Sequence, residues 1–76
     1  MKLFNKKTQI VYFTRTMKDG CMFISIVERW ETDINGIPFK AFMSSREFHP
    51  TRNKARHYAN SMARYQFKAH CACYGM

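Results

Sequence analysis

Acidic residues are scarce in this sequence and are confined to its middle. The 76 residues contain five Asp or Glu against 13 Lys or Arg, which gives a net charge of +8. No carboxylate side chain occurs in residues 1–18 or in residues 48–76, and each of these segments carries a charge of +5. Residues 19–47 have a net charge of −2. A folded domain with this asymmetry has a positive end or face, which attracts polyanions such as nucleic acid, an acidic protein or an anionic membrane.

Long hydrophobic runs and a regular set of cysteines are also missing. No segment approaches the roughly 20 apolar residues of a membrane span. The lysine-rich start continues into Thr8 and Gln9 instead of a secretory hydrophobic region, so we expect no membrane attachment and a cytoplasmic location. The odd number of cysteines, Cys21, Cys71 and Cys73, does not suit a disulfide framework, and we expect reduced thiols.

The length of the chain limits its architecture and its chemistry. We see no internal repeat, low-complexity tract or linker, so residues 1–76 are expected to form a single small basic domain. A chain of this size buries only about 60% of the surface that its unfolded form exposes, which leaves little room for an elaborate catalytic cavity. The hydrophobic content of 46% and the seven Phe, four Tyr and one Trp argue against disorder. We therefore expect a folded protein that is not an enzyme and needs no cofactor.

Three segments in the first two thirds of the chain have the pattern of β-strands. Residues 9–15 are rich in β-branched and aromatic side chains, and residues 21–30 and 37–43 alternate between two faces. The turns between them contain Asp19-Gly20 and Asn35-Gly36, which suit tight hairpin connections. This order predicts a three-stranded antiparallel meander.

The last third of the chain has a helical period. Pro50 and Thr51 are suited to the first turn and the cap of a helix. Small and apolar residues then recur at a spacing of 3.6 residues: Ala55, Tyr58, Ala59, Met62, Ala63 and Gln66. A second row contains Arg52, Arg56, Asn60 and Arg64, flanked by Lys54, His57 and Lys68. The sequence thus predicts an α+β fold, with the meander packed against one C-terminal helix in the order βββα.

One helix covers one face of such a sheet and leaves the other face open. The sequence leaves open which face the helix covers; one assignment places the helix on the face that bears Ile24, Ile26, Phe39 and Ala41. The open face is then expected to carry Phe23, Ser25, Val27, Arg29, Lys40 and Phe42, with either Tyr12 or Phe13. Aromatic rings beside cations suit base or sugar stacking with phosphate neutralisation. The alternative is that these rings pack against the N-terminal segment or the C-terminal tail.

The helix start resembles that of a known class of nucleic-acid-binding domain. The segment Thr51-Arg52-Asn53-Lys54-Ala55-Arg56-His57-Tyr58-Ala59 is similar to the final helix of double-stranded RNA-binding domains. The same βββα order is similar to the arm-site-binding domains of phage and transposon integrases and to the plant ethylene-response type of DNA-binding domain. The first resemblance implies phosphate contacts by Arg52, Lys54 and Arg56, and the others imply groove contacts by Arg15, Arg29 and Lys40. The chain departs from the RNA-binding family in having only eight residues before the first expected strand and Arg52-Asn53 where that family has a lysine pair.

Histidines and cysteines near the C-terminus offer metal ligands at an unsuitable spacing. The run His70-Cys71-Ala72-Cys73, even with His49 or His57, lacks the spacing of a structural zinc site, so we expect no metal. Cys71 paired with His57 has no context for nucleophilic catalysis. Three of the six methionines, Met22, Met43 and Met62, fall in the expected core pattern.

These observations predict a nucleic-acid-binding protein, with DNA favoured over double-stranded RNA and a duplex as the ligand. The expected contact residues are Arg15, Arg29, Lys40, Arg52, Lys54, Arg56, Asn60, Arg64, Lys68, Phe23 and Phe42. The alternative is a small phage-encoded inhibitor, of the anti-CRISPR or another anti-defence type, that binds an acidic surface of a host protein or nucleoprotein complex in the host cytoplasm. A homodimer formed by pairing of exposed strand edges stays open as well.

Overall fold

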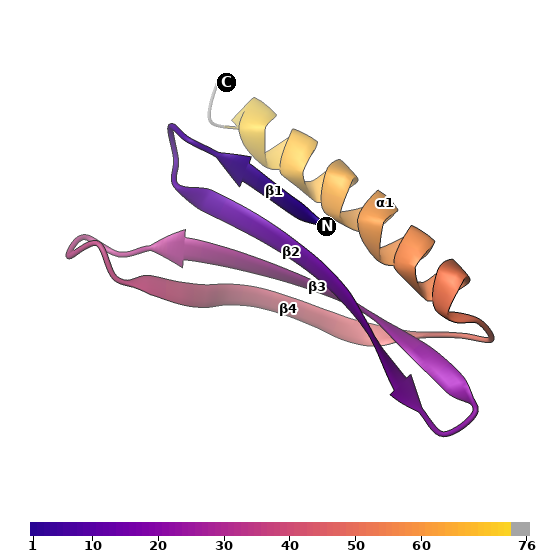
Figure 1. Ribbon diagram of the computed structural model, residues 1–76. Helices are drawn as coiled ribbons and strands as arrows, with labels where there is room; N and C mark the ends of the chain where they lie inside the picture. The colour runs from indigo at the N-terminus through magenta and orange to yellow at the C-terminus, as the bar shows by residue number, and fades with distance from the viewer. Residues whose placement is uncertain (74–76) are drawn as a thin grey trace.

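The fold is a four-stranded antiparallel sheet with one helix across one of its faces (Figure 1). The computed structural model describes the backbone of residues 1–73 and the side chains of these residues except 45, 46, 72 and 73. The elements are β1 (Lys2–Asn5), β2 (Ile10–Asp19), β3 (Met22–Thr32), β4 (Pro38–His49) and α1 (Arg52–Cys73). The strands lie in the order β1-β2-β3-β4, so the α+β class and the meander packed against a C-terminal helix are confirmed, with one strand more than the three predicted.

Strand β1 is the element that the sequence pattern did not reveal. It has only four residues, and Leu3 alone of its side chains packs against the core. The strand is held by its pairing with β2 from Lys2↔Phe13 to Asn5↔Ile10. In the connecting turn, the Asn5 side-chain oxygen accepts a hydrogen bond of 2.9 Å from the Lys7 backbone N–H. Four residues are too few for the alternation to be distinguished from chance.

The two predicted hairpins, β2–β3 and β3–β4, are built on the predicted turn residues, although their strands extend further than expected. Asp19 pairs with Met22, so Gly20 and Cys21 form a two-residue turn, in which Gly20 has a φ of 63°. In the turn between β3 and β4, the Asp33 side chain accepts hydrogen bonds of 2.9 Å from two backbone N–H groups downstream of it. The hairpin ends project beyond the helix, and the molecule measures 42 × 23 × 16 Å (Figure 1).

The core lies between α1 and one face of the sheet. Ile10, Tyr12 and Val27 of the sheet meet Ala59 and Ala63 of the helix, and partly buried side chains pack around them, namely Leu3, Met62 and Phe67. The alanines are 0% exposed, since their small side chains let the helix axis approach the sheet closely. Alanine at every fourth position therefore allows α1 to pack closely against the strands.

The structure has the reverse of that assignment of the two sheet faces for β3. Val27 points toward α1, whereas Ile24 and Ile26 lie on the face that the helix does not cover. Each face of β3 carries apolar side chains, Val27 on one and Ile24 and Ile26 on the other, so alternation alone could not decide which face the helix would cover. The face away from α1, which we call the open sheet face, carries Lys2, Phe4, Val11, Phe13, Arg15, Met17, Asp19, Met22, Ile24, Ile26, Glu28, Trp30, Lys40, Met43 and Phe48.

A β-bulge explains a second difference from the sequence-based expectation. The register shifts between Arg29 and Trp30, so Phe42 pairs with Arg29 while Lys40 pairs with Trp30. An extra residue between paired positions reverses the direction of the side chains that follow it. Phe42 therefore lies on the helix side and Lys40 on the open sheet face, although the simple alternation predicted the same face for both. Met43, expected in the core, is 49% exposed on the open sheet face.

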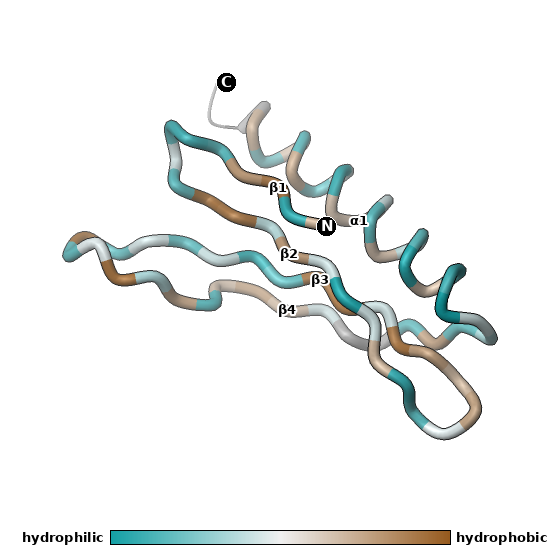
Figure 2. Tube along the Cα trace, viewed as in Figure 1, coloured by the Kyte–Doolittle hydropathy of each residue, from teal (hydrophilic) through white to brown (hydrophobic). Residues whose placement is uncertain are grey.

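Hydropathy differs between the helix and the strands. Figure 2 shows hydrophobic segments along β1, β2 and the β2–β3 hairpin, whereas α1 is hydrophilic or intermediate along most of its length.

In the described part of the chain, no helix combines the length and the apolar character required to cross a membrane.

Candidate nucleic-acid interface

Helix α1 begins at a cap that the sequence predicted. The Thr51 side-chain oxygen accepts a hydrogen bond of 3.2 Å from the Lys54 backbone N–H, and the Thr51 carbonyl accepts one of 3.1 Å from Ala55. Thr51 is therefore the N-cap and Lys54 the third residue of the helix. The first turn contains no acidic residue. The N-terminal end of a helix dipole is positive, so the cations of this first turn add to a potential that is already positive.

The exposed side of α1 is lined by cations. Lys54, Arg64 and Lys68 are exposed on one side, and we call them together the basic helix face; Arg56 is also exposed, but it lies two residues from Lys54, on the side of the helix beside Thr14 and Thr16. Arg64 and Lys68 are four residues apart and lie on the same side of the helix, one turn from each other. Among the described side chains, none of the four forms an ion pair with a carboxylate. Their charge is therefore available to an external anion.

Two members of the predicted helix row point toward the sheet instead of outward. A guanidinium N–H of Arg52 donates to the Thr16 hydroxyl at 3.3 Å, and the group lies 5.1 Å from the centre of the Phe23 ring. Asn60 is half-buried, and its side-chain oxygen accepts a hydrogen bond of 2.6 Å from the Thr14 hydroxyl. Asn60 thus joins α1 to β2, and Arg52 is held over the end of the sheet.

The cations predicted on the sheet are bound to its own carboxylates. Glu28 is 8% exposed and lies 3.9 Å from Arg15 and 3.3 Å from Lys40 on the open sheet face. Arg29 lies on the helix side and forms an ion pair of 3.1 Å with Glu31. These three cations therefore do not form one surface, and each has an internal partner.

The environment of Arg29 keeps its guanidinium charged. Partial burial by itself lowers the pKa of Arg29, but the Tyr12 phenol and the Glu31 carboxylate outweigh this effect and the pKa is raised overall. The aromatic Phe42 ring is also close, with its centre 5.8 Å from the guanidinium carbon. Arg29 is thus fixed in position by neighbours on three strands.

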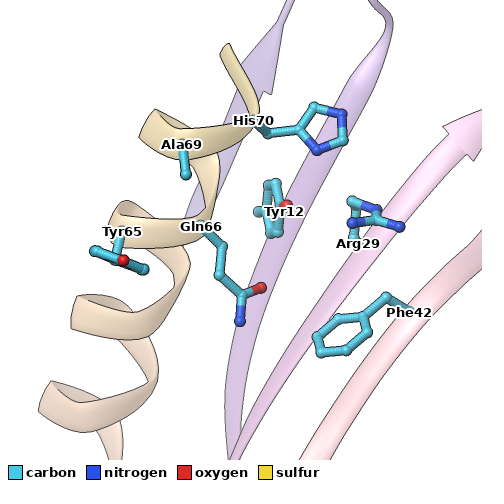
Figure 3. Close-up of a pocket in the computed structure, with 7 residues that line it drawn as sticks. All are labelled: Tyr12, Arg29, Phe42, Tyr65, Gln66, Ala69 and His70. Carbon is cyan, nitrogen blue, oxygen red and sulfur yellow. The ribbon is translucent and has the colours of Figure 1, made fainter. Parts of the chain in front are cut away.

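A cleft of about 320 Å³ opens between the C-terminal half of α1 and the sheet beside Arg29 (Figure 3). Its lining residues are Tyr12, Arg29, Phe42, Tyr65, Gln66, Ala69 and His70. The Gln66 amide and the Phe42 ring point into the space beside Tyr12 in Figure 3. Aromatic walls with an amide and a guanidinium suit a planar ring that carries hydrogen-bonding groups. The volume is at the lower limit for a small-molecule site.

A wider groove lies beside the N-terminal half of α1. It encloses about 560 Å³ and is lined by His49, Asn53, Lys54, His57, Tyr58 and Ser61. The rings of His49 and Tyr58 are 5.0 Å apart, and the buried Nε2 of His49 has no hydrogen-bond partner among the described residues. This groove places polar groups next to Lys54. The sequence-based site did not include His49, because it comes from the end of β4 and no spacing rule links it to the helix.

The Phe residues predicted as stacking platforms are on the helix side of the sheet. Phe23 is partly buried under Arg52, and Phe42 is 37% exposed in the cleft. The most exposed aromatic of the helix is Tyr65, at 73%. The predicted aromatic and basic surface on the uncovered face therefore does not exist in that form.

The histidine and cysteine run near the C-terminus lies partly outside the described side chains. Cys71 has a free thiol whose sulfur accepts a hydrogen bond of 3.0 Å from the Asn5 amide, and the His70 ring lies 6.5 Å from that of Tyr12. Cys73 is among the residues whose side chain is not described. Within the side chains that are described, no three His, Cys, Asp or Glu residues are grouped closely enough to hold a metal ion.

No protein-family model matches this chain, and neither the curated proteins nor the solved structures include a significant match to it.

Proposed function

We propose that this protein binds duplex nucleic acid through phosphate contacts made by the basic helix face. The observation that carries the proposal is the difference between the two sets of cations. Arg15, Arg29 and Lys40 on the sheet are each paired with a carboxylate, whereas the described cations of α1 are not. Of the two modes that the sequence resemblance suggested, the distribution of ion pairs supports the helix mode over the sheet mode.

The dimensions of the helix suit a duplex backbone. Lys54 and Lys68 are 14 residues apart in a 22-residue helix, which corresponds to about 21 Å along its axis. Successive phosphates of one DNA strand rise by about 3.4 Å, so this length covers about six of them. The dipole at the helix N-terminus adds to the attraction near Lys54. We favour DNA over RNA because the major groove of B-form DNA is about as wide as a helix.

The proposed activity is binding without catalysis, in the cytoplasm, with neither a cofactor nor a metal. An inhibitor encoded by a phage would use the same cations against an acidic protein surface in the cytoplasm of its host. That alternative predicts strong salt-sensitive binding to an acidic protein and no preference between duplex and single-stranded nucleic acid. Phosphate contacts along a helix predict that a duplex is preferred.

The test is the salt dependence of duplex DNA binding in a pair of matched variants. Arg64→Gln/Lys68→Gln removes two charges from the basic helix face, and Lys2→Gln/Lys18→Gln removes two exposed charges from elsewhere. Each phosphate contact contributes about 0.9 to the slope of log K against log salt, so the helix variant is expected to lower the slope by about 1.8. The control variant has the same net charge and should keep the slope nearly unchanged.

Fluorescence anisotropy with a labelled duplex, at four salt concentrations, measures both slopes. Equal losses in the two variants would mean that only net charge matters, and the proposed interface would be wrong. A slope that falls only in the helix variant would support it.

A further inference from the structure

The open sheet face exposes a large apolar surface. Phe4, Met43 and Phe48 are each about half exposed, at 49%, 49% and 52%. Phe13 and Met17 are exposed by 38% and 46% on the same face. Scattered hydrophobic residues are normal on a surface, but a contiguous group marks a site of interaction.

The strand register shows how these apolar side chains are arranged. Phe13 pairs with Glu28, and Glu28 pairs with Met43, so Phe13 and Met43 flank Glu28 in one row across three strands. A second row across the same strands consists of Met17, Ile24 and Phe48. Ile24 is only 7% exposed, because its neighbours in the row already shield it. Arg15 and Ile26 lie between the two rows, so the apolar side chains surround a central group of ion pairs, and no element of the described chain covers this face.

The open sheet face is close to electrical neutrality, unlike the helix side. Its described side chains include three cations, Lys2, Arg15 and Lys40, and two carboxylates, Asp19 and Glu28, which gives a net charge of +1. At the centre, Glu28 offsets one of the two positive charges of Arg15 and Lys40 through its two ion pairs. An acidic partner would find little to attract it here, whereas a second copy of the same face would meet little repulsion.

We propose that the open sheet face is the interface of a symmetric homodimer, in which the sheets of two copies pack face to face. Sheets pack in this way at a separation of about 10 Å with side chains interdigitated. Four strands about 4.8 Å apart and about eight residues long cover roughly 500 Å² per copy, or on the order of 1,000 Å² in total. That area is at the lower limit for a specific interface, so the dimer is expected to dissociate at micromolar concentrations.

The dimer would place two nucleic-acid-binding helices in one assembly. This consequence rests on the proposed function. The two α1 helices lie on the outer surfaces of the four-layer dimer, about 30 Å apart if each layer adds about 10 Å. This distance exceeds the Debye length of about 10 Å at 0.1 M salt, so the two basic helix faces repel each other little. They point in opposite directions, and the dimer can therefore hold two duplexes at once.

Sedimentation equilibrium of the whole chain tests the dimer without nucleic acid, over about 1–200 µM. The wild type is expected to approach a mass of about 18 kDa, twice the 9.1 kDa of one chain. Phe13→Thr/Met43→Thr removes the apolar groups on both sides of Glu28 while keeping good strand formers, and it should weaken self-association at least tenfold. The control Ile34→Thr/Ile37→Thr alters exposed apolar residues in the β3–β4 turn, at 100% and 59% exposure, and should still dimerise.

Far-UV circular dichroism checks that each variant is folded, and Phe48→Lys replaces the double variant if that one is not. A wild type that stays at 9.1 kDa at every concentration overturns the proposal. So does a dimer that the face variants do not weaken, because such a dimer would form through strand edges or another surface.

Capture of a labelled duplex by a second duplex on beads tests the bridging. Wild-type protein is expected to link the two, and Phe13→Thr/Met43→Thr is expected to bind one duplex with unchanged affinity per chain without linking two. A protein that dimerises but binds no duplex would refute the proposed function and support the dimer. A protein that binds a duplex but never dimerises would refute the dimer and support the proposed function.

Discussion

Replacing Lys54 by glutamate is expected to stabilise the protein and to weaken its binding of DNA. Lys54 is the third residue of α1, and its backbone N–H donates to the Thr51 side chain at 3.2 Å. Glutamate at this position can reach back to the Thr51 backbone N–H and complete a capping box. It also replaces a positive charge, which the helix dipole disfavours at the N-terminus, with a negative charge, which the dipole favours. Each of these two effects on the free energy of unfolding is about 0.3–1 kcal/mol. Together these effects should raise the free energy of unfolding by about 1 kcal/mol.

The two expected effects can be measured separately. For a domain of this size, about 1 kcal/mol corresponds to a rise of about 4–8 °C in Tm, which thermal unfolding followed by circular dichroism will detect at low salt. Loss of one phosphate contact weakens duplex binding about 8-fold at 0.1 M salt, if each contact contributes about 0.9 to the slope. Lys54→Gln is the matched control. It should raise Tm less than Lys54→Glu does, and it should lose the same phosphate contact.

Lys54→Glu is expected to raise Tm and to lower the affinity for DNA, and each of these two expectations can fail separately. A lower Tm for Lys54→Glu would mean that the cap or the dipole argument is wrong. Unchanged affinity for duplex DNA, measured by anisotropy, would mean that Lys54 does not contact phosphate. A cation kept at a position where it costs stability is expected where binding depends on it.

Three further changes test the packing that positions the helix and the sheet. Ala59→Leu adds volume at a site that is 0% exposed, and urea unfolding should show a loss of about 1–3 kcal/mol. Asp33→Ala removes the acceptor of two backbone N–H groups in the β3–β4 turn and should cost about 1 kcal/mol by the same measurement. Glu28→Gln leaves Arg15 and Lys40 without their shared carboxylate, and a Tm lower by a few degrees is expected; no change would show that these ion pairs contribute little.

The elements set by local sequence were predicted correctly. The Thr51 cap, the alanine spacing of α1 and the Gly20 turn each depend on residues within a few positions of one another, and the structure has all three. The exposed charge of the helix follows from the same periodicity. Local periodicity thus identified the helix and its exposed Arg64 and Lys68, but it also placed Arg52 and Asn60 in an outward row, although both contact the sheet.

The features that depend on distant contacts were not predictable in this way. Val27 and Ile24 are both apolar, so the face of β3 that the helix covers is decided by the packing of the whole domain. The ion pairs of Glu28 join strands whose register includes a bulge, and nothing in the spacing of Arg15 and Lys40 indicates that they meet at one carboxylate. The sequence therefore overestimated how many cations are free.

The measurement that most directly tests the central claim is an NMR titration of isotope-labelled protein with a short DNA duplex. The largest shifts are expected at Lys54, Arg64 and Lys68 on α1, with little change at Arg15 and Lys40 on the open sheet face. Shifts concentrated at Arg15 and Lys40, or no shifts at duplex concentrations well above that of the protein, would contradict it.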